Sequence, residues 1–192
     1  GSSIEYGKIK SPQIENKLNN QKTFSIYGDA KLKSTKFLLN LNKKYNFPTT
    51  VLRLYLVYGP GQDANRVVPI TIFNAIKDDY FACSNGTQTR DFLFIDDLIK
   101  AIIKSLRNKK VDGEIINIGT GKPIRIKDLI IKICDLVGSG KPEFGKISLR
   151  KDEIKRLYPK TLKSKKLLNW KSSVSLEKGL ITTIKYYKNY KD

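Results

Sequence analysis

The 192-residue sequence contains no histidine and no methionine, and it has only two cysteines and one tryptophan. The absence of histidine excludes catalysis by a histidine base and makes most zinc sites impossible, so we expect no metal centre. Cys83 and Cys134 each lie in an apolar run, which favours two buried, reduced thiols and a cytoplasmic location. Because no methionine begins the chain, we expect it to be processed or a fragment.

Long hydrophobic runs are also missing. No apolar stretch reaches the length of a membrane span, and no secretory signal opens the chain, so we expect no membrane partner. Hydrophobic residues make up 40% of the chain and charged residues 29%, which is typical of a soluble globular protein. At this length, one domain is expected.

Acidic residues are scarce relative to basic ones. The formal net charge is +19, from 37 Lys and Arg against 18 Asp and Glu. This charge has two interpretations: a general compositional bias, or an anionic partner such as nucleic acid or a phosphate-bearing substrate. The lysines are spread along the chain. This favours a general compositional bias together with a phosphorylated small molecule as the ligand, over nucleic acid. The one patch of interleaved aromatic and basic residues, at 186–191, is expected to end a helix.

Segments with a helical pattern alternate with apolar, β-branched segments. The pattern predicts helices over about 27–45, 67–77, 96–106 and 126–137, and after Ser175. It predicts strands over about 49–58, 80–84, 89–94, 113–119 and 147–149, with a hairpin turn at Asn85-Gly86 and a loop over 138–142. Residues 1–7 have the pattern of a strand that runs into a loop. This alternation indicates an α/β fold with a mainly parallel sheet.

Three Tyr-x-x-x-Lys pairs occur, namely Tyr6/Lys10, Tyr27/Lys31 and Tyr187/Lys191. Chance produces such pairs readily in a chain this rich in lysine. Only Tyr27/Lys31 opens a predicted helix between a Ser-containing turn and a β-type run. Residues four apart share one helix face, where an ammonium group helps a phenol to exchange a proton. We take the other two pairs as ordinary surface neighbours.

Several segments, taken in order, resemble the extended short-chain dehydrogenase/reductases that act on nucleotide sugars, the NAD-dependent epimerase/dehydratase family. The matching segments are Ser2–Gly7, Tyr27–Lys31, Arg53–Gln62, Asn85–Phe92, Ile95–Asp97, Asn117–Gly121, Lys165–Trp170 and Val174–Leu180. No single segment is specific, but their order and spacing together are. The resemblance implies a Rossmann-like doubly wound parallel sheet with a small α/β substrate-binding subdomain.

The resemblance also implies catalytic and cofactor-binding residues. Tyr27 would exchange a proton with a sugar hydroxyl, and Ser2 would bond the same oxygen. Lys31 would assist Tyr27 and bond the ribose of the nicotinamide, with Tyr55 also at the cofactor, NAD or NADP. Ser2 has two alternatives: a vector-derived Gly1-Ser2, or a simple cap hydroxyl. Its 25-residue separation from Tyr27 suits the family and favours the catalytic role.

The expected partner is a nucleotide diphosphate sugar, and the expected oligomer is a homodimer. Arg90 and Arg150 would hold the diphosphate, since the guanidinium fork suits phosphate oxygens. The alternative for each is a surface ion pair. Asn65 and Arg66 lie where the family contacts the nucleotide sugar. Three further polar positions are expected to hold loops rather than substrate: Asp91, Asp97 and Asn117.

The chain departs from the family pattern at three points. Leu56 stands where an asparagine usually contacts substrate, and Ala30 where serine often precedes the lysine. The glycine-rich turn that seats the pyrophosphate is absent from the sequence. We therefore expect residues 1–192 to lack the dinucleotide-binding half, with Rossmann-type segments at about 1–62 and 96–122 and substrate-binding segments at about 63–95 and 123–192. The isolated chain should bind NAD weakly and be inactive.

The sequence also limits which reactions of this family are expected. Sugar dehydratases of this family place Asp-Glu after the catalytic hydroxyl residue, but Ser3 and Ile4 stand here, which disfavours dehydration. Without histidine, the Cys/His chemistry of the 3,5-epimerising members is excluded. Redox at sugar carbon 4 remains: epimerisation through a transient ketone, or 4-keto reduction. The alternative is a catalytically inactive member that binds nucleotide or nucleic acid.

Overall fold

The computed structural model describes residues 1–15, 22–149 and 153–189. The helices are α1 (Ile26–Tyr45), α2 (Val67–Lys77), α3 (Ile95–Leu106), α4 (Ile126–Val137), α5 (Leu162–Leu168) and α6 (Leu176–Lys188), with short 3-10 helices η1 (Ser3–Tyr6) and η2 (Lys109–Val111). The strands are β1 (Val51–Leu54), β2 (Leu56–Tyr58), β3 (Tyr80–Cys83), β4 (Thr89–Arg90), β5 (Phe92–Phe94), β6 (Ile115–Ile118), β7 (Ile124–Arg125), β8 (Lys141–Phe144) and β9 (Arg156–Leu157).

Parallel pairing dominates the sheets. β1 pairs with β6, β2 with β5, and β3 with β8, all in parallel. β4 pairs in parallel with β9 and antiparallel with β7. Parallel strands need crossover connections, and the helices supply them. The predicted α/β class with a mainly parallel, Rossmann-like sheet is confirmed.

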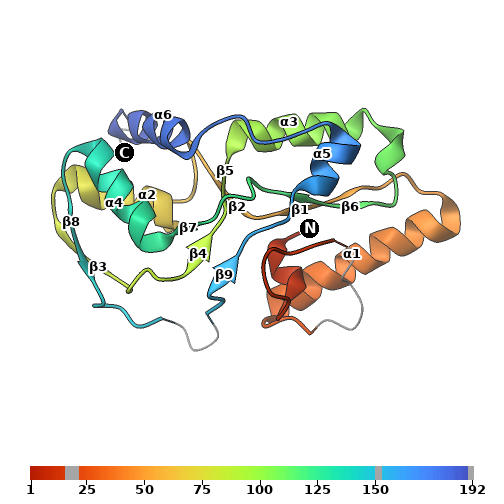
Figure 1. Ribbon diagram of the computed structural model, residues 1–192, viewed down its shortest axis with the longest axis horizontal. Coiled ribbons are helices and arrows are strands. Elements are labelled where there is room, and N and C mark those ends of the chain that lie inside the picture. Colours follow the sequence, from red (N-terminus) through yellow and green to blue (C-terminus); the bar gives the residue numbers. More distant parts are fainter. Residues whose placement is uncertain (16–21, 150–152, 190–192) are drawn as a thin grey trace.

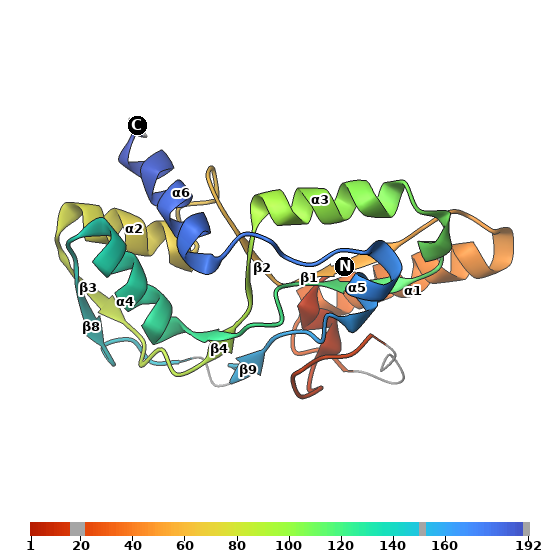
Figure 2. The same ribbon diagram turned by 45° about the horizontal axis from the view of Figure 1, so that its top comes forward.

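Helices cover both sides of the β1–β6 pair. In Figures 1 and 2, α1 and η1 lie on one side of these strands and α3 lies on the other. α5 contacts both β6 and α3. The buried residues of this layer include Leu98, Ile116, Ile118 and Trp170. This arrangement puts β1 between α1 and the α3 layer, so the ends of β1 and the start of α1 belong to one packed unit.

A second group of elements lies at the other end of the molecule. Here α2, α4 and α6 pack on one another, and the β3–β8 pair lies beside them (Figures 1 and 2). Their shared core includes Ile72, Leu129, Ile133, Leu180 and Tyr58. The apolar stripe of α4 at 3.6-residue spacing explains why that helix buries one face here. The division into Rossmann-type and substrate-binding segments stays a prediction.

Local signals set the ends of the helices. The Ser25 hydroxyl oxygen accepts a hydrogen bond from the Gly28 N–H at 3.1 Å and so caps α1 at its start. Asn46 ends α1 in the left-handed conformation, with φ 51°. Ser175 caps α6 in the same way, through the Lys178 N–H at 3.2 Å. The predicted helices are thus confirmed, with boundaries close to those expected. Among the described helices, none is long and apolar enough to cross a membrane.

Several strand predictions were wrong. The expected strand over 49–58 changes partners at Tyr55: its N–H bonds Ile118 O at 3.4 Å, while the next N–H, of Leu56, bonds Asp91 O at 3.1 Å. The expected hairpin at Asn85-Gly86 does not form, because β3 and β4 pair with other strands. The carbonyl of Gly86 instead accepts a hydrogen bond from Lys127 N at the start of α4.

Two further differences concern the later part of the chain and its start. Residues 147–149 form no strand, and a strand instead occupies 141–144, inside the expected loop, where it pairs with β3. A proline within this short strand is tolerated because it lies at a sheet edge. Residues 3–6 form η1 rather than extended chain, and extended pairing at the start is limited to a bridge between Ser2 and Leu54.

Candidate active site

Ser2 lies at the carboxyl end of β1. It forms a parallel bridge with Leu54, the last residue of that strand. Open α/β sheets bind ligands beyond the carboxyl ends of their strands, so Ser2 is placed where a ligand is expected. Its hydroxyl oxygen also caps η1 by accepting a hydrogen bond from Ile4 N at 3.5 Å. This long bond uses the oxygen as an acceptor and leaves the hydroxyl proton available to a ligand.

Tyr27 and Lys31 lie one turn apart at the start of α1. The Lys31 Nζ is 5.6 Å from the centroid of the Tyr27 ring. The Tyr27 side chain is 58% exposed, and its hydroxyl makes no hydrogen bond to the described part of the chain. The phenol is therefore accessible to a ligand and lies beside an ammonium group. This is the helix-face arrangement that the spacing predicted.

The tyrosines of the other two Tyr-x-x-x-Lys pairs are buried. Tyr6 donates a hydrogen bond to Asn117 Oδ1 at 2.7 Å, and burial raises the pKa of its hydroxyl. Tyr187 donates to the carbonyl oxygen of Gln62, and Lys191 lies outside the described residues. Neither phenol can serve a substrate without leaving the core. Both are structural tyrosines rather than the surface neighbours expected.

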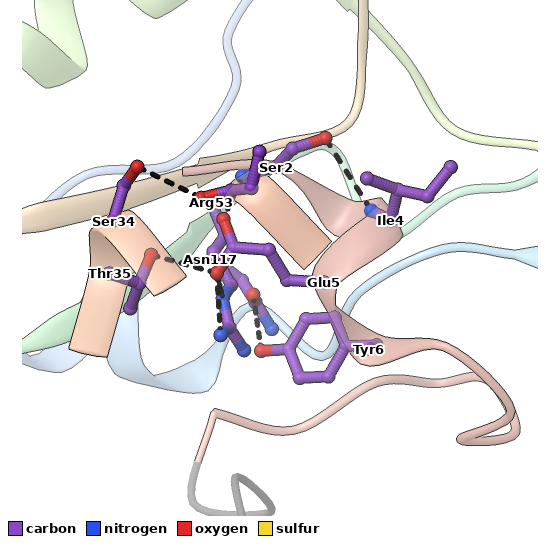
Figure 3. A network of polar contacts seen from close by, with 9 residues as sticks. Ser2, Ile4, Glu5, Tyr6, Ser34, Thr35, Arg53 and Asn117 are labelled. Atoms are coloured by element: carbon purple, nitrogen blue, oxygen red, sulfur yellow. Dashed lines mark hydrogen bonds and ion pairs between the residues drawn. The ribbon is translucent and has the colours of Figure 1, made fainter. Parts of the chain in front are cut away.

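A buried polar network joins the Ser2 turn to α1 and β1. Figure 3 shows Glu5 of η1 between Ser2, Thr35 of α1 and Arg53 of β1. Glu5 Oε1 accepts a hydrogen bond from Ser2 N at 2.6 Å. Glu5 Oε2 accepts one from Thr35 Oγ1 at 2.8 Å and two from Arg53, at 2.8 and 3.0 Å. The sequence pattern does not predict this network, because a lone Glu in a turn gives no signal of its distant partners.

One cavity brings together three of the predicted ligand-binding residues. It measures about 400 Å³, and Tyr55, Asn65 and Arg66 line it. Leu56 lines the same cavity, so the departure from the family pattern falls within it. The Tyr55 hydroxyl points elsewhere: it is buried and donates to Gln13 Oε1 at 2.8 Å. That hydroxyl is therefore engaged within the protein, although Tyr55 lines the cavity.

Gln62 also lines this cavity, and the sequence analysis assigned it no role. Its Nε2 donates to Val57 O at 2.7 Å. Its Oε1 is buried and has no hydrogen-bond partner within the described ranges. A buried acceptor without a donor is costly, so this oxygen is suited to a ligand or water in the cavity. Its position after the Gly59-Pro60-Gly61 turn was the available signal.

Arg90 is buried at the end of β4. Its Nη2 forms an ion pair with Glu153, and its Nη1 donates to Thr89 O at 2.8 Å. Burial lowers the pKa of its guanidinium group, and Glu153 opposes that shift. An ion pair thus occurs here, but it is largely buried rather than at the surface. A diphosphate would have to share Arg90 with Glu153 or displace Glu153. Arg150 lies outside the described residues.

A second cavity of about 530 Å³ adjoins the Arg90–Glu153 pair. Its lining comes from two segments and one aromatic side chain: residues 7–11, residues 153–156 and Phe24. The lining residues include Lys8, Lys10, Lys155 and Arg156 against the single acidic residue Glu153, so they carry an excess of positive charge. It lies between the end of η1 and the segment that leads into α1. Its charge favours an anionic ligand.

Asp91 and Asn117 hold neighbouring segments of the chain, as expected. Asp91 accepts hydrogen bonds from Thr120 N at 2.8 Å and Gly121 N at 2.6 Å. Burial raises the pKa of the Asp91 carboxyl, against the effect of those bonds. Asn117 is buried at β6 and bonds Tyr6 and the segment around Gln13. These contacts fix the Gly119-Thr120-Gly121 turn and the segment after η1.

The cysteines are both unpaired and buried, as expected. Cys83 ends β3 and Cys134 lies in α4. Burial raises the pKa of the Cys83 thiol to about 11 and that of the Cys134 thiol in the same direction. Their low reactivity makes them packing residues rather than part of the candidate site.

Comparison with known proteins shows the family of the chain. Residues 1–119 match the NAD dependent epimerase/dehydratase family. A UDP-glucuronate 4-epimerase of Thermodesulfobacterium geofontis is 34% identical, over 97% of this chain and 57% of its own length. A CDP-abequose synthase of Salmonella muenchen is 33% identical, over 67% of this chain and 44% of its own length.

The fold is shared with solved structures of the same kind. The UDP-glucuronic acid 4-epimerase of Bacillus cereus, crystallised with UDP-glucuronic acid and NAD, superposes with a TM-score of 0.87 at 32% identity, over 98% of this chain and 60% of that one. The chain spans about half the length of the curated relatives it matches. By its sequence and its fold, the chain belongs to the NAD-dependent epimerase/dehydratase family.

Proposed function

We propose that this chain is the catalytic and substrate-binding portion of a nucleotide-sugar epimerase or 4-keto reductase that performs redox at sugar carbon 4. The observation that carries the proposal is the accessible Tyr27 phenol beside Lys31 at the start of α1. Ser2, at the carboxyl end of β1, supports it. The relatives named above act on nucleotide sugars by their descriptions, which supports the same class.

Each of the three residues has a chemical task. Tyr27 takes the proton from the sugar hydroxyl as the ketone forms and returns it when the ketone is reduced. Ser2 donates a hydrogen bond to the same sugar oxygen and orients it. The Lys31 ammonium stabilises the deprotonated form of Tyr27 during the transfer. The three groups together allow proton transfer without histidine.

We propose NAD or NADP as the cofactor. The donors at Tyr27 and Lys31 suit the hydroxyl groups of a nicotinamide ribose, and the accessible face of α1 leaves them free to bind it. Tyr55 contributes through the atoms that line its cavity. When bound, the nicotinamide supplies hydride transfer at the sugar carbon. The glycine-rich turn that binds a pyrophosphate is not in this sequence, so these residues hold only part of the cofactor.

The proposed substrate is a nucleotide diphosphate sugar. Arg90 and Arg150 are proposed to bind the diphosphate, with Arg90 released from Glu153 as the phosphates arrive. Asn65 and Arg66 are proposed to bind the nucleotide part, in the cavity that they line with Tyr55. Leu56 makes part of the wall of that cavity apolar, so at this position the substrate is proposed to be held by packing.

Two residues beside Ser2 favour carbon-4 redox over dehydration. Ser3 is buried and Ile4 carries no ionisable group, so neither can move a proton at the neighbouring sugar carbons.

We also propose a homodimer. Its support is the exposed apolar side chains along α1, Ile26, Phe37 and Tyr45. The free thiols support a cytoplasmic location.

An assay of the complete gene product tests the proposed function. It is incubated with a panel of UDP-, CDP- and dTDP-sugars and NAD, and separately with 4-keto sugar nucleotides and NADPH, and products are separated by chromatography. Interconversion of carbon-4 epimers supports the epimerase, and consumption of NADPH with a 4-keto sugar nucleotide supports the reductase. Nucleotide binding without turnover of any sugar would instead support the inactive, binding-only alternative.

A further inference from the structure

We propose that Glu5 is a positioning residue, whose single buried carboxylate sets the place of Ser2 relative to the catalytic helix α1. This inference rests on the proposed roles of Ser2, Tyr27 and Lys31. It concerns residues to which no function has been assigned so far: Glu5, Thr35 and Arg53. Figure 3 shows all three side chains meeting beneath the Ser2 turn.

The two oxygens of Glu5 serve different elements. Oε1 accepts from the main-chain N–H of Ser2, at 2.6 Å, and so fixes the backbone that carries the Ser2 hydroxyl. Oε2 accepts from Thr35 at 2.8 Å and from Arg53 at 2.8 and 3.0 Å. One rigid carboxylate therefore links η1, α1 and β1. Moving any one of these elements breaks a charge-assisted hydrogen bond.

Thr35 continues the row of residues that begins with Tyr27 and Lys31. The three positions follow one another at intervals of four residues on α1, so they lie along one side of the helix. At 1.5 Å per residue, Thr35 is about 6 Å along the axis from Lys31 and about 12 Å from Tyr27. Because the helix is rigid over that length, holding Thr35 fixes how far Lys31 and Tyr27 extend past the Ser2 turn.

Stability alone does not account for this network. Glu5, Thr35 and Arg53 are 0%, 1% and 0% exposed, so two charges are buried completely. A buried ion pair is often no more stabilising than well-packed apolar residues of the same volume. Arg53 Nη1 is buried without a hydrogen-bond partner in the described part of the chain, although the guanidinium lies 4.3 Å from the centroid of the Tyr6 ring. What the Glu5–Arg53 pair provides beyond packing is a set of hydrogen bonds with fixed directions.

Proton transfer needs that geometry. Catalytic groups must be held within about 0.5 Å of their productive positions, and an error of about 1 Å can cost about 100-fold in rate. Ser2 and Tyr27 come from different elements, so their separation depends on contacts between those elements. The Glu5 carboxylate is the contact that touches the Ser2 backbone and α1 at once.

Two threonines offer a matched test. Thr35 and Thr183 are both buried in helices, but the Thr35 hydroxyl bonds Glu5 whereas the Thr183 hydroxyl bonds Gly179 O in its own helix, at 2.7 Å. In the complete gene product, Thr35→Val should lower kcat at least about 10-fold and change KM by less than about 2-fold. Thr35→Ser, which keeps the hydroxyl, should restore most of the rate. Thr183→Val should leave kcat unchanged.

Glu5→Gln gives a second measurement. An amide cannot accept from Ser2 N on one side and from Thr35 and Arg53 on the other, so kcat should again fall at least about 10-fold. If Thr35→Val keeps kcat within about 2-fold of the wild type while Tyr27→Phe is inactive, the positioning role is wrong and the proposed function stands. If Tyr27→Phe keeps full activity, the proposed function itself fails. These two failures are therefore distinguishable.

Discussion

The carboxylate of Asp97 accepts two hydrogen bonds from Ser173, one from its N–H and one from its hydroxyl group, each 2.7 Å long. It accepts a third from Val174 N, at 2.8 Å. Asp97 is on α3, in the Rossmann-like layer, while Ser173 and Val174 lead into α6 in the other group of elements. One buried side chain thus ties the last helix to the layer that carries β1. The expectation that Asp97 holds a loop is confirmed.

Asp97→Asn should destabilise the protein by about 1–3 kcal/mol, because an amide cannot accept all of these bonds. Burial raises the pKa of the Asp97 carboxyl, but the bonds from Val174 and Ser173 outweigh it and hold that pKa below 3.8. The stabilisation is therefore present above pH 3.8 and is lost as the pH falls through the lower pKa of the folded state. Urea unfolding should show the variant's deficit near neutral pH and its disappearance in acid.

Asp96→Asn is the matched control for this prediction. Asp96 is the neighbouring aspartate in the first turn of α3, and it is exposed. Its replacement should change the free energy of unfolding by no more than about 0.5 kcal/mol. An equal deficit in both variants would mean that charge near the helix terminus, and not the bonds to Ser173 and Val174, produces the effect.

The two thiols should be unreactive in the folded protein. The raised pKa of about 11 leaves about one Cys83 side chain in a thousand as thiolate near pH 8, and burial also restricts access to the reagent. Alkylation with iodoacetamide should therefore be slow for Cys83 and Cys134 in buffer and fast for both in urea. Rapid labelling of either thiol in the folded protein would show that its surroundings open readily.

Arg90→Ala should weaken binding of a nucleotide diphosphate sugar by roughly 1.5–3 kcal/mol, the usual contribution of a charge-assisted contact. Calorimetry with the complete gene product measures this. Arg125→Ala is the control, since Arg125 lies opposite Thr89 on the neighbouring strand but has an exposed side chain. Glu153→Gln should strengthen binding, because it removes the competitor for the guanidinium group. Unchanged affinity in Arg90→Ala would leave Arg90 with only its ion pair to Glu153.

The sequence predicted the helices well because their signals are local. The cap at Ser25, the apolar spacing of α4 and the start of α6 after Ser175 depend on residues a few positions apart. The accessible Tyr27 and its neighbour Lys31 were predicted for the same reason. Strand pairing failed where partners are distant: β3 takes β8, about 60 residues away, rather than the adjacent β4.

The parts of the site that the sequence did not predict are those built by distant contacts. Glu5 meets Arg53 and Thr35 only after α1 folds back onto η1. The Arg90–Glu153 pair likewise joins residues 63 positions apart. The buried Oε1 of Gln62 becomes notable only when its cavity is formed. A resemblance between motifs supplies the residue types but not these contacts.

The most direct test of the account is the turnover of Tyr27→Phe in the complete gene product, compared with Tyr45→Phe. Both tyrosines are exposed on α1, at 58% and 68%, so neither change should alter the melting temperature by more than about 2 °C. If Tyr27 is the acid–base, Tyr27→Phe should lower kcat by about 100- to 10,000-fold while Tyr45→Phe keeps the wild-type rate. Equal, near-normal rates in the two variants would contradict the assignment of Tyr27.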